Sequence, residues 1–339
     1  MKILITGHTG FKGSWLTLLL NKMGHEVSGL SLDPSSESHF SLSGITQFVR
    51  EDYRVDIRDK IALLASLRES QPQFIFHLAA QSLVKESFRK PEYTYDVNVN
   101  GTLNILETAK MLPSVKGILI VTSDKVYDNA SEEKKAFLED DPLGFSDPYS
   151  TSKAMADLLS QSWSENSKEQ VIGIARAGNV IGGGDFGVDR LIPDLFRHAR
   201  GQTSALVRYP KAVRPWQYVL DCLYGYVLQM NFILEGQRGV FNFGPESGQY
   251  FEVEKVANGF LEFLGRGSWT LDKRKIYGES SFLTLDSGKA ASILKWTNRY
   301  NFQNSLKITA GWYLDYLEGK NLSKSSQSQV EDFLANVLI

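Results

Sequence analysis

Several features are scarce in this chain of 339 residues, and each absence excludes a class of protein. There is a single cysteine, Cys222, which excludes a disulfide framework and any metal site built from several thiolates. The five histidines are scattered without the spacing of metal ligands, so we expect no metal. The apolar runs, such as the one around residues 18–20, are far shorter than a membrane span.

Excess charge of one sign is also absent. The formal net charge is -2, with 22% charged and 42% hydrophobic residues, which is ordinary composition for a globular protein. This balance argues against nucleic acid or a membrane surface as the main partner. The chain enters a strand-like segment at residues 2–6, too early for the apolar part of a signal peptide, so we expect a cytoplasmic enzyme.

Short apolar runs alternate with helical patterns, which indicates a parallel sheet built from strand–helix–strand units. We expect strands at residues 2–6, 27–31, 74–78, 117–122 and 171–176. We expect helices at residues 12–23, 59–69, 95–110 and 151–165. The pattern predicts an α/β protein with a doubly wound parallel sheet of the Rossmann type.

A glycine-rich turn, GHTGFKG at residues 7–13, follows the first strand and opens the first helix. Its glycines allow a tight turn, close approach of the backbone to a pyrophosphate, and close packing of the helix on the sheet. The helix N-terminus offers free N–H groups and partial positive charge to phosphates. The turn predicts a dinucleotide site made by Gly7, Thr9, Gly10, Phe11, Lys12 and Gly13.

The acidic residues after the next strands bear on the choice of cofactor. Asp33 lies just past the second strand, where a carboxylate can bind the ribose hydroxyls of NAD. No arginine stands nearby in the sequence to receive the 2′-phosphate of NADP, so NAD is favoured. Asp56 and Ile57 fit a contact on the adenine side, although Asp56 is equally well read as a loop carboxylate.

The rhythm of strands and helices changes after about Gly182. Loops become longer, arginine and tryptophan enter them, and the strand-like segment 239–243 follows less regular spacing. We predict a cofactor-binding domain at residues 1–181 that also carries the catalytic residues, and a smaller substrate-binding region at 182–319. The chain can cross back between the two. Residues 320–339, rich in serine and lysine, are expected to form a mobile tail.

A catalytic set is indicated by YSTSK at residues 149–153, in which Tyr149 and Lys153 share one face of a helix. A lysine beside a tyrosine stabilises the phenolate, which can act as a base on a hydroxyl group near neutral pH. Ser123 follows a predicted strand, at the carboxyl edge where parallel sheets place their chemistry.

These motifs resemble the extended short-chain dehydrogenases/reductases, together with HLAAQ at 77–81, NVNGT at 98–102 and RAGNV at 176–180. More narrowly, the chain resembles the CDP-glucose branch of the nucleotide-sugar 4,6-dehydratases. The matching segments are TGHTGFKGS at 6–14, TSDK at 122–125, YDN at 127–129, GGGD at 182–185, DRLIP at 189–193 and RPWQ at 214–217. The resemblance runs from Lys2 to about Gly319.

The resemblance implies an internal redox cycle in which hydride leaves C4 of the sugar for NAD, water is lost from C5 and C6, and hydride returns to C6. Tyr149 would take the C4 hydroxyl proton, Ser123 would hold that oxygen, and Asp124 would protonate the departing C6 hydroxyl. Further contacts to the cofactor are expected from Leu78, Ala79, Ala80, Asn98, Tyr149 and Lys153.

Lys125 departs from the better-known dTDP-glucose dehydratases, which carry a glutamate there as an evident base for the C5 proton. The CDP-glucose branch carries the same Asp-Lys pair as this chain. Lys125 either accepts the C5 proton with a depressed pKa, or stabilises the enolate, or is simply a surface lysine.

A nucleotide diphosphate suits bidentate binding by arginine. The expected substrate contacts are Gln81, Asn179, Arg190, Arg208 and Arg214. Trp216 or Tyr218 is expected to pack against the base or the sugar.

Other functions stay open at this point. An epimerase shares the Tyr–Lys pair but needs no acid at Asp124. A GDP-mannose dehydratase would favour NADP and an arginine near Ser31. A regulator that only senses cofactor commonly loses the tyrosine or the lysine, and both are present here. The resemblance also implies a homodimer or homotetramer built on the helices at 95–110 and 151–165.

Overall fold

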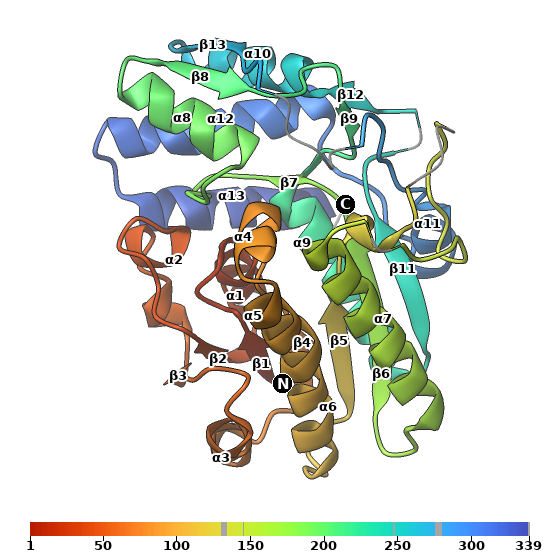
Figure 1. Ribbon diagram of the computed structural model, residues 1–339. Coiled ribbons are helices and arrows are strands. Elements are labelled where there is room, and N and C mark those ends of the chain that lie inside the picture. Colours follow the sequence, from red (N-terminus) through yellow and green to blue (C-terminus); the bar gives the residue numbers. More distant parts are fainter. Residues whose placement is uncertain (130–133, 145, 247, 275–279, 338–339) are drawn as a thin grey trace.

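The computed structural model of this protein describes residues 1–129, 134–144, 146–246, 248–274 and 280–337. Its centre is a sheet of seven parallel strands (Figure 1). Across the sheet these are β11 (Gly239–Phe243), β6 (Val171–Ala177), β5 (Gly117–Val121), β4 (Phe74–His77), β1 (Lys2–Thr6), β2 (Glu26–Ser31) and β3 (Asp52–Arg54). The order runs outward from β1 and β4 in both directions, which confirms the predicted doubly wound fold of the Rossmann type.

Helices cover both faces of the sheet, so its strands are apolar on both sides. In β1, Ile3 and Ile5 belong to one hydrophobic cluster and Leu4 to the other, as the two-residue period of a strand requires. In the first cluster, the helices α1 (Phe11–Lys22) and α9 (Val219–Leu234) pack against the sheet. Those of the second are α3 (Lys60–Ser70), α6 (Gly101–Lys110) and α7 (Pro148–Asn166).

The helix expected at residues 95–110 is interrupted. It comprises α5 (Pro91–Tyr95), a π-helical turn η2 (Asp96–Asn100) and then α6. The wide turn lies where the side chain of Asn98 leaves the helix to bind the backbone of the loop after β4. Such turns often mark functional sites in helices. Shorter helical turns are α2 (His39–Leu42), η1 (Ile45–Phe48), α4 (Val84–Arg89), η3 (Asp124–Val126) and α11 (Gly288–Leu294).

The second region lies over the carboxyl-terminal edge of the sheet (Figure 1). Its helices are α8 (Leu191–Arg200), α10 (Val253–Leu264) and α12 (Phe302–Leu317). Its strands form pairs: β7 (Val180–Ile181) with β10 (Gln217–Tyr218), β9 (Val213–Arg214) with β12 (Phe251–Glu252), and β8 (Ser204–Val207) with β13 (Ser268–Leu271). Between these elements α9 and β11 return to the sheet, so the chain crosses back from the second region to the first.

The mobile tail predicted for residues 320–339 is wrong, because residues 322–337 form the helix α13 (Leu322–Val337). Its buried residues are Leu322, Ser326, Val330 and Phe333, three or four positions apart, and they make one stripe on the helix. Ser326 accepts a hydrogen bond from the indole of Trp312 at 2.9 Å. Of the residues that suggested disorder, Lys324 and Ser328 are exposed, whereas Ser326 is buried.

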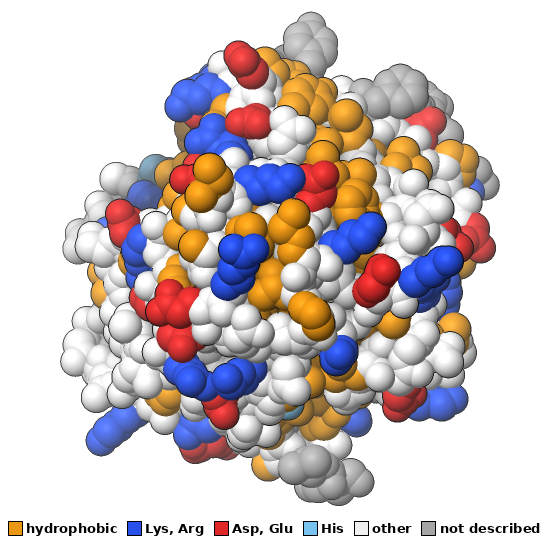
Figure 2. Space-filling view, turned by 90° about the horizontal axis from the view of Figure 1, so that it is seen from below, with side chains coloured by type: hydrophobic (Ala, Val, Ile, Leu, Met, Phe, Trp, Pro, Cys, Tyr) orange, Lys and Arg blue, Asp and Glu red, His pale blue; other side chains and the backbone are white. Residues whose placement is uncertain are grey.

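Figure 2 shows the face turned away from the second region, where basic and acidic side chains are interspersed with apolar ones. Opposite charges that alternate in this way give no extended field of one sign over that face. Among the residues that the structure describes, no helix combines the length and apolarity needed to cross a membrane.

Candidate active site

A cleft of about 1010 Å³ opens between the carboxyl-terminal edge of the sheet and the second region. It begins at the end of β1, where the strand order reverses between β1 and β4, which is where open α/β sheets bind ligands. The predicted catalytic, cofactor and substrate residues all line this cleft except Asp33, Gln81 and Asn98.

Each glycine of the turn between β1 and α1 has its own role. Gly7 has a φ of +77°, and a Cβ there would lie 2.8 Å from the Ala79 amide nitrogen. A Cβ on Gly13 would lie 2.1 Å from the Gly7 carbonyl oxygen, so helix and turn pack too closely for any side chain. Gly10 is less crowded, with Gly7 oxygen at 3.2 Å as its nearest contact, and the fold itself hardly requires a glycine there.

The missing side chain of Gly10 therefore leaves the turn open toward the cleft, as a bound pyrophosphate needs. No side chain within the described ranges caps the first turn of α1, whose N–H groups are available to an anion. The turn thus fits the pyrophosphate of NAD by its shape and by its dipole.

We expected no arginine near Asp33, and this is wrong for the folded protein, where Arg54 lies beside it. The register of β2 and β3 pairs Ser31 with Arg54, and this places the guanidinium 3.6 Å from the Asp33 carboxylate. Arg54 also donates to Asp52 at 2.6 Å, and Asp52 in turn contacts the ring of the buried His8 at 2.9 Å. Asp33 and Asp52 therefore neutralise the charge of Arg54, near the end of the cleft where the cofactor is expected to bind.

We expect the protein to bind NAD more tightly than NADP, because Asp33 and Asp52 would repel a 2′-phosphate and already occupy Arg54. Replacing Asp33 with asparagine should narrow the affinity ratio of NAD to NADP by about tenfold. Calorimetric titration measures both affinities, and Glu26→Gln, at the other end of β2, serves as control. Tighter binding of NADP than of NAD by the unmodified protein would contradict this expectation.

Asp33 itself is 89% exposed and outside the cleft lining, so its ribose contact stays a prediction. Asp56 does line the cleft. Its carboxylate accepts from the Arg58 guanidinium at 2.7 Å, and this hydrogen bond lowers the pKa of Asp56.

Gln81 and Asn98 hold the loop after β4. The Gln81 side chain accepts from the Leu83 amide at 2.6 Å and donates to Thr94 at 2.9 Å. Asn98 accepts from the Gln81 amide at 2.8 Å and donates to its carbonyl at 3.0 Å. These hydrogen bonds hold the loop, and the contacts of Gln81 with the substrate and of Asn98 with the cofactor stay predictions.

The start of α7 places Tyr149, the predicted catalytic tyrosine. Asp147 accepts from the Ser150 amide at 2.9 Å and Pro148 occupies the first helical position, so the helix begins at a defined residue. Tyr149 and Lys153 then follow on one face. The Lys153 ammonium donates to the Val121 carbonyl at 2.9 Å, which ties the helix to the end of β5.

The electrostatics of this pair are those of a buried site. Burial raises the pKa of Tyr149 to about 12, although a hydrogen bond with Ser123 opposes the shift. Burial, and next the Lys12 ammonium, lower the pKa of Lys153 to about 7. The structure thus brings Ser123, which follows β5, beside the Tyr149–Lys153 pair of α7.

Asp124 is buried, with 4% of its surface exposed, and it lines the cleft beside Ser123. One carboxylate oxygen accepts from the Ser123 hydroxyl at 2.8 Å, while the other is buried without a hydrogen-bond partner in the described part of the chain. Burial raises the pKa of Asp124, so the protonated form is favoured relative to an exposed aspartate. This is the state that a general acid requires before it acts.

Lys125 is half-buried and lines the cleft next to Asp124, and this placement excludes its interpretation as a plain surface lysine. Its backbone N–H donates to the Ser123 hydroxyl at 3.2 Å. Its ammonium lowers the pKa of Asp124, against the larger effect of burial.

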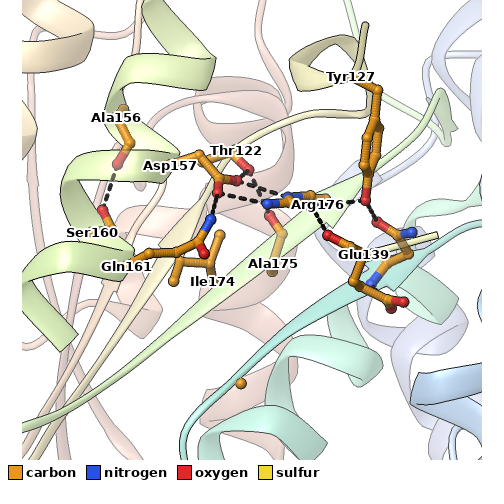
Figure 3. A network of polar contacts seen from close by, with 12 residues as sticks. Thr122, Tyr127, Glu139, Ala156, Asp157, Ser160, Gln161, Ile174, Ala175 and Arg176 are labelled. Carbon is orange, nitrogen blue, oxygen red and sulfur yellow. Dashed lines mark hydrogen bonds and ion pairs between the residues drawn. The ribbon is translucent and has the colours of Figure 1, made fainter. Parts of the chain in front are cut away.

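The RAGNV segment contributes a buried ion pair behind the site (Figure 3). The Arg176 guanidinium binds both carboxylate oxygens of Asp157, at 2.8 and 2.9 Å, and donates to the Tyr127 hydroxyl at 2.9 Å. Asp157 also accepts from Thr122 at 2.9 Å. Since Thr122 precedes Ser123 and Asp157 lies one turn after Lys153, the network fixes β5 and α7 relative to each other.

Replacing Arg176 with methionine should lower the free energy of unfolding by about 3–5 kcal/mol, because Asp157 would stay buried without its partner. The double variant Arg176→Met/Asp157→Leu removes both charges and should recover much of this loss. Denaturant unfolding of the three proteins tests the expectation. Equal losses in the single and the double variant would contradict it.

The substrate half of the cleft contains several arginines. Arg190 binds Asp185 at 3.1 Å and reaches across to the Ser82 hydroxyl at 3.1 Å, so it joins the two sides of the cleft. Arg208, Arg214 and Asn179 line it as well. A nucleotide diphosphate is the kind of ligand that such a set can hold.

Trp216 and Tyr218, the two aromatic residues expected to contact the substrate, lie in different environments. Trp216 lines the cleft, whereas Tyr218 is buried behind it and donates to Gln329 of α13 at 2.7 Å. Tyr218 is therefore a packing residue, and the expectation that it contacts the base or sugar is wrong.

Sequence reasoning assigned no role to several polar residues that line the substrate half, because only the fold brings them together. These are Lys85, Asp189, Asp194, His198, Asp272 and Arg274. Lys85 and Asp189 form an ion pair between the two regions.

The comparisons with known proteins agree with this geometry. The profile of the NAD dependent epimerase/dehydratase family matches residues 3–244. The chain is 37% identical to the CDP-glucose 4,6-dehydratase of Salmonella typhimurium, over 98% of this chain and 96% of that protein. It is 27% identical to the UDP-glucose 4-epimerase of Lactobacillus helveticus, over 94% and 99%.

Among solved structures, the UDP-glucose-4-epimerase of Stenotrophomonas maltophila with bound NAD has a TM-score of 0.83, 22% identity, and coverage of 94% of this chain and 99% of that one. At that identity the likeness shows the fold alone. The matched family profile spans the glycine turn, Ser123 and the Tyr149–Lys153 pair, and its description names NAD as the cofactor. This chain, whose resemblance to the extended short-chain dehydrogenases/reductases is thereby confirmed, belongs to the NAD dependent epimerase/dehydratase family.

Proposed function

We propose that this protein is a nucleotide-sugar 4,6-dehydratase that converts CDP-glucose to CDP-4-keto-6-deoxyglucose and water. The observation that carries the proposal is the buried Asp124 beside Ser123, with one oxygen unpartnered among the described residues. A 4-epimerase exchanges hydride at C4 only and has no use for an acid at this place. The relative that is 37% identical carries the name of the same activity.

Each catalytic residue has a role that its position supports. NAD, when bound at the glycine turn, supplies the acceptor and the donor of hydride. Tyr149 accepts the proton of the C4 hydroxyl, and the Ser123 hydroxyl holds the same oxygen. Lys153, buried on the same face of α7, stabilises the phenolate by its charge.

The loss of water depends on two other residues, Asp124 and Lys125. Once C4 is a ketone, the C5 proton is acidic and the C6 hydroxyl can leave. Asp124 gives its proton to that hydroxyl, which departs as water. Lys125, next to it on the cleft wall, either accepts the C5 proton or stabilises the charge of the enolate.

We further propose that two copies pair through α6 and α7, as a homodimer or as half of a homotetramer. The support is an apolar stripe on the outer side of α7, where Met155 is 44% and Leu158 is 55% exposed. Met111, at the end of α6, is 58% exposed. Apolar side chains that lie three positions apart on a helix suit a partner helix.

The proposed function is tested by incubating the NAD-loaded protein with CDP-glucose, dTDP-glucose, UDP-glucose and GDP-mannose. We expect the absorbance of a 4-keto sugar in alkali to develop with CDP-glucose first, and a product smaller by one water. A C4 epimer of the same mass as the substrate would identify an epimerase. A 4-keto product from GDP-mannose alone would overturn the assignment of the substrate.

A further inference from the structure

The substrate half of the cleft contains a carboxylate that the proposed chemistry does not use. Asp194 lies in the first turn of α8 and lines the cleft, close to arginines that suit a diphosphate. A negative charge at this place opposes the binding of a diphosphate. A favourable role for Asp194 therefore requires an interaction with another part of the ligand. Asp194 is partly buried, with 32% of its side chain exposed.

The position of Asp194 is one helical turn beyond Arg190. Arg190 precedes α8 and interacts electrostatically with Tyr149, so it marks the sugar end of the cleft. A helix rises by about 1.5 Å per residue, which places Asp194 roughly 6 Å and His198 roughly 12 Å further along the wall. With the sugar at Tyr149 and the diphosphate at the arginines, the nucleoside extends along this part of α8.

Apolar side chains line the cleft on the elements that flank Asp194. From α8, Leu191, Ile192 and Leu195 line the cleft, and Ala205 and Val207 of β8 line it as well. Apolar walls of this kind can bury the flat faces of a base. A carboxylate between them then meets an edge of the base, where hydrogen-bonding groups lie.

The edge of the base decides what a carboxylate prefers. An ionised carboxylate only accepts hydrogen bonds. Cytosine presents an exocyclic amine, which donates, where uracil and thymine present a carbonyl oxygen, which accepts. Carboxylates pair with the cytosine amine in nucleic-acid recognition for the same reason.

We propose that Asp194 is the residue that selects cytosine, by accepting a hydrogen bond from the exocyclic amine of the base. The inference rests on the proposed function, since it names the part of CDP-glucose that this wall of the cleft recognises.

Neighbouring contacts prepare the carboxylate for this role. One oxygen, Oδ1, accepts from the guanidinium of Arg197, and that guanidinium also donates to the Phe186 carbonyl at 3.1 Å. The second oxygen, Oδ2, has no hydrogen-bond partner among the residues described. Burial raises the pKa of Asp194 while Arg197 opposes the shift, so the group is desolvated but paired. When a carboxylate has lost its water and the bound base offers no donor, binding of that base is weakened.

Binding of free nucleotides isolates the recognition of the base from catalysis. Calorimetry on the NAD-loaded protein would give dissociation constants for CDP, UDP and dTDP. We expect the wild-type protein to prefer CDP, and Asp194→Asn to reduce the preference for CDP over UDP by about 10- to 100-fold. The reason is that an amide can turn its NH₂ toward the uracil carbonyl. Asp194→Ser, which places no carboxylate there, should give the same direction of change.

Two control variants separate the acceptor from general charge. Asp272→Asn alters another carboxylate of the cleft, but both Asp272 oxygens already bind Arg274, so the CDP preference should persist. Arg197→Gln breaks the ion pair but keeps the Asp194 carboxylate, so it should retain more of the preference for CDP than Asp194→Asn does.

A wild-type ratio of CDP to UDP binding in both Asp194 variants would overturn the inference about the base. Failure of the proposed function reads differently. In that case the wild-type protein binds CDP selectively through Asp194, but no nucleotide sugar yields a 4-keto product.

Discussion

Tyr149→Phe should lose turnover by about 10²–10⁴-fold while the protein keeps its bound NAD. The phenol is the group that removes the C4 hydroxyl proton, and phenylalanine retains the ring but no base. The ring itself is buried at the start of α7, with 8% of its surface exposed, so its packing persists in the variant. The measurement is turnover of CDP-glucose, together with the NAD content of the purified protein.

Tyr127→Phe is the matched control. Tyr127 is also buried, and its hydroxyl donates to Asn242 at 2.6 Å and accepts from Arg176, away from the cleft. We expect this variant to lose stability by about 0.5–1.5 kcal/mol with little change in turnover at a temperature where it is folded. Near wild-type turnover in Tyr149→Phe, with matched fold and NAD content, would refute Tyr149 as the base.

Asp124→Asn should separate the two halves of the reaction. Oxidation at C4 requires Tyr149, Lys153 and Ser123, which this substitution leaves in place. Loss of the C6 hydroxyl requires a proton donor of carboxylic acidity, which asparagine is not. We therefore expect reduction of the bound cofactor in a single turnover to persist, while release of 4-keto-6-deoxy product falls by about 10²–10⁴-fold.

The alternative role for Asp124 is purely structural, because its side chain accepts from Ser123 at the turn after β5. If Asp124 were only structural, Asp124→Asn would lower both the stability of the protein and its affinity for the cofactor. The rates of both half-reactions would then fall by the same factor. Absorbance of the reduced nicotinamide, with deuterium exchange from solvent at C5, distinguishes the two. Release of product at the normal rate by Asp124→Asn would rule out Asp124 as the acid.

Local pattern was sufficient for the fold and for the centre of the site. The central strands β1, β4 and β5 contain runs of Ile, Leu, Val and Phe that are buried on both faces, and each run carries its signal within a few residues. The glycine turn is equally local, because Gly7 and Gly13 are required by contacts within the turn and with the next strand end. Ser123, Asp124 and Lys125 follow β5 directly, and the pairing of β5 with β6 and β4 brings their edge to the cleft.

What escaped prediction depends on register or on competition between partners. Arg54 reaches Asp33 only through the pairing of β2 with β3, which the sequence does not display. Gln81 and Asn98 are polar residues near a ligand site, but the loop backbone satisfies them first. The buried positions of α13, one of which is Ser326, are separated by polar residues, and these hide a narrow buried stripe. Asp194 is the acidic residue of α8, whose last turn is basic. Its proposed role could be inferred only after the fold had placed it on the wall of the cleft.

The central claim is that hydride leaves C4 and returns to C6 of the same sugar while water is lost. The most direct measurement uses CDP-glucose labelled with deuterium at C4 and determines the position of the label in the product by NMR and mass spectrometry. Our account predicts a 4-keto-6-deoxy product that carries the deuterium at C6, with one hydrogen from solvent at C5. Deuterium retained at C4 of an epimer, or a dehydrated product without deuterium at C6, would contradict it.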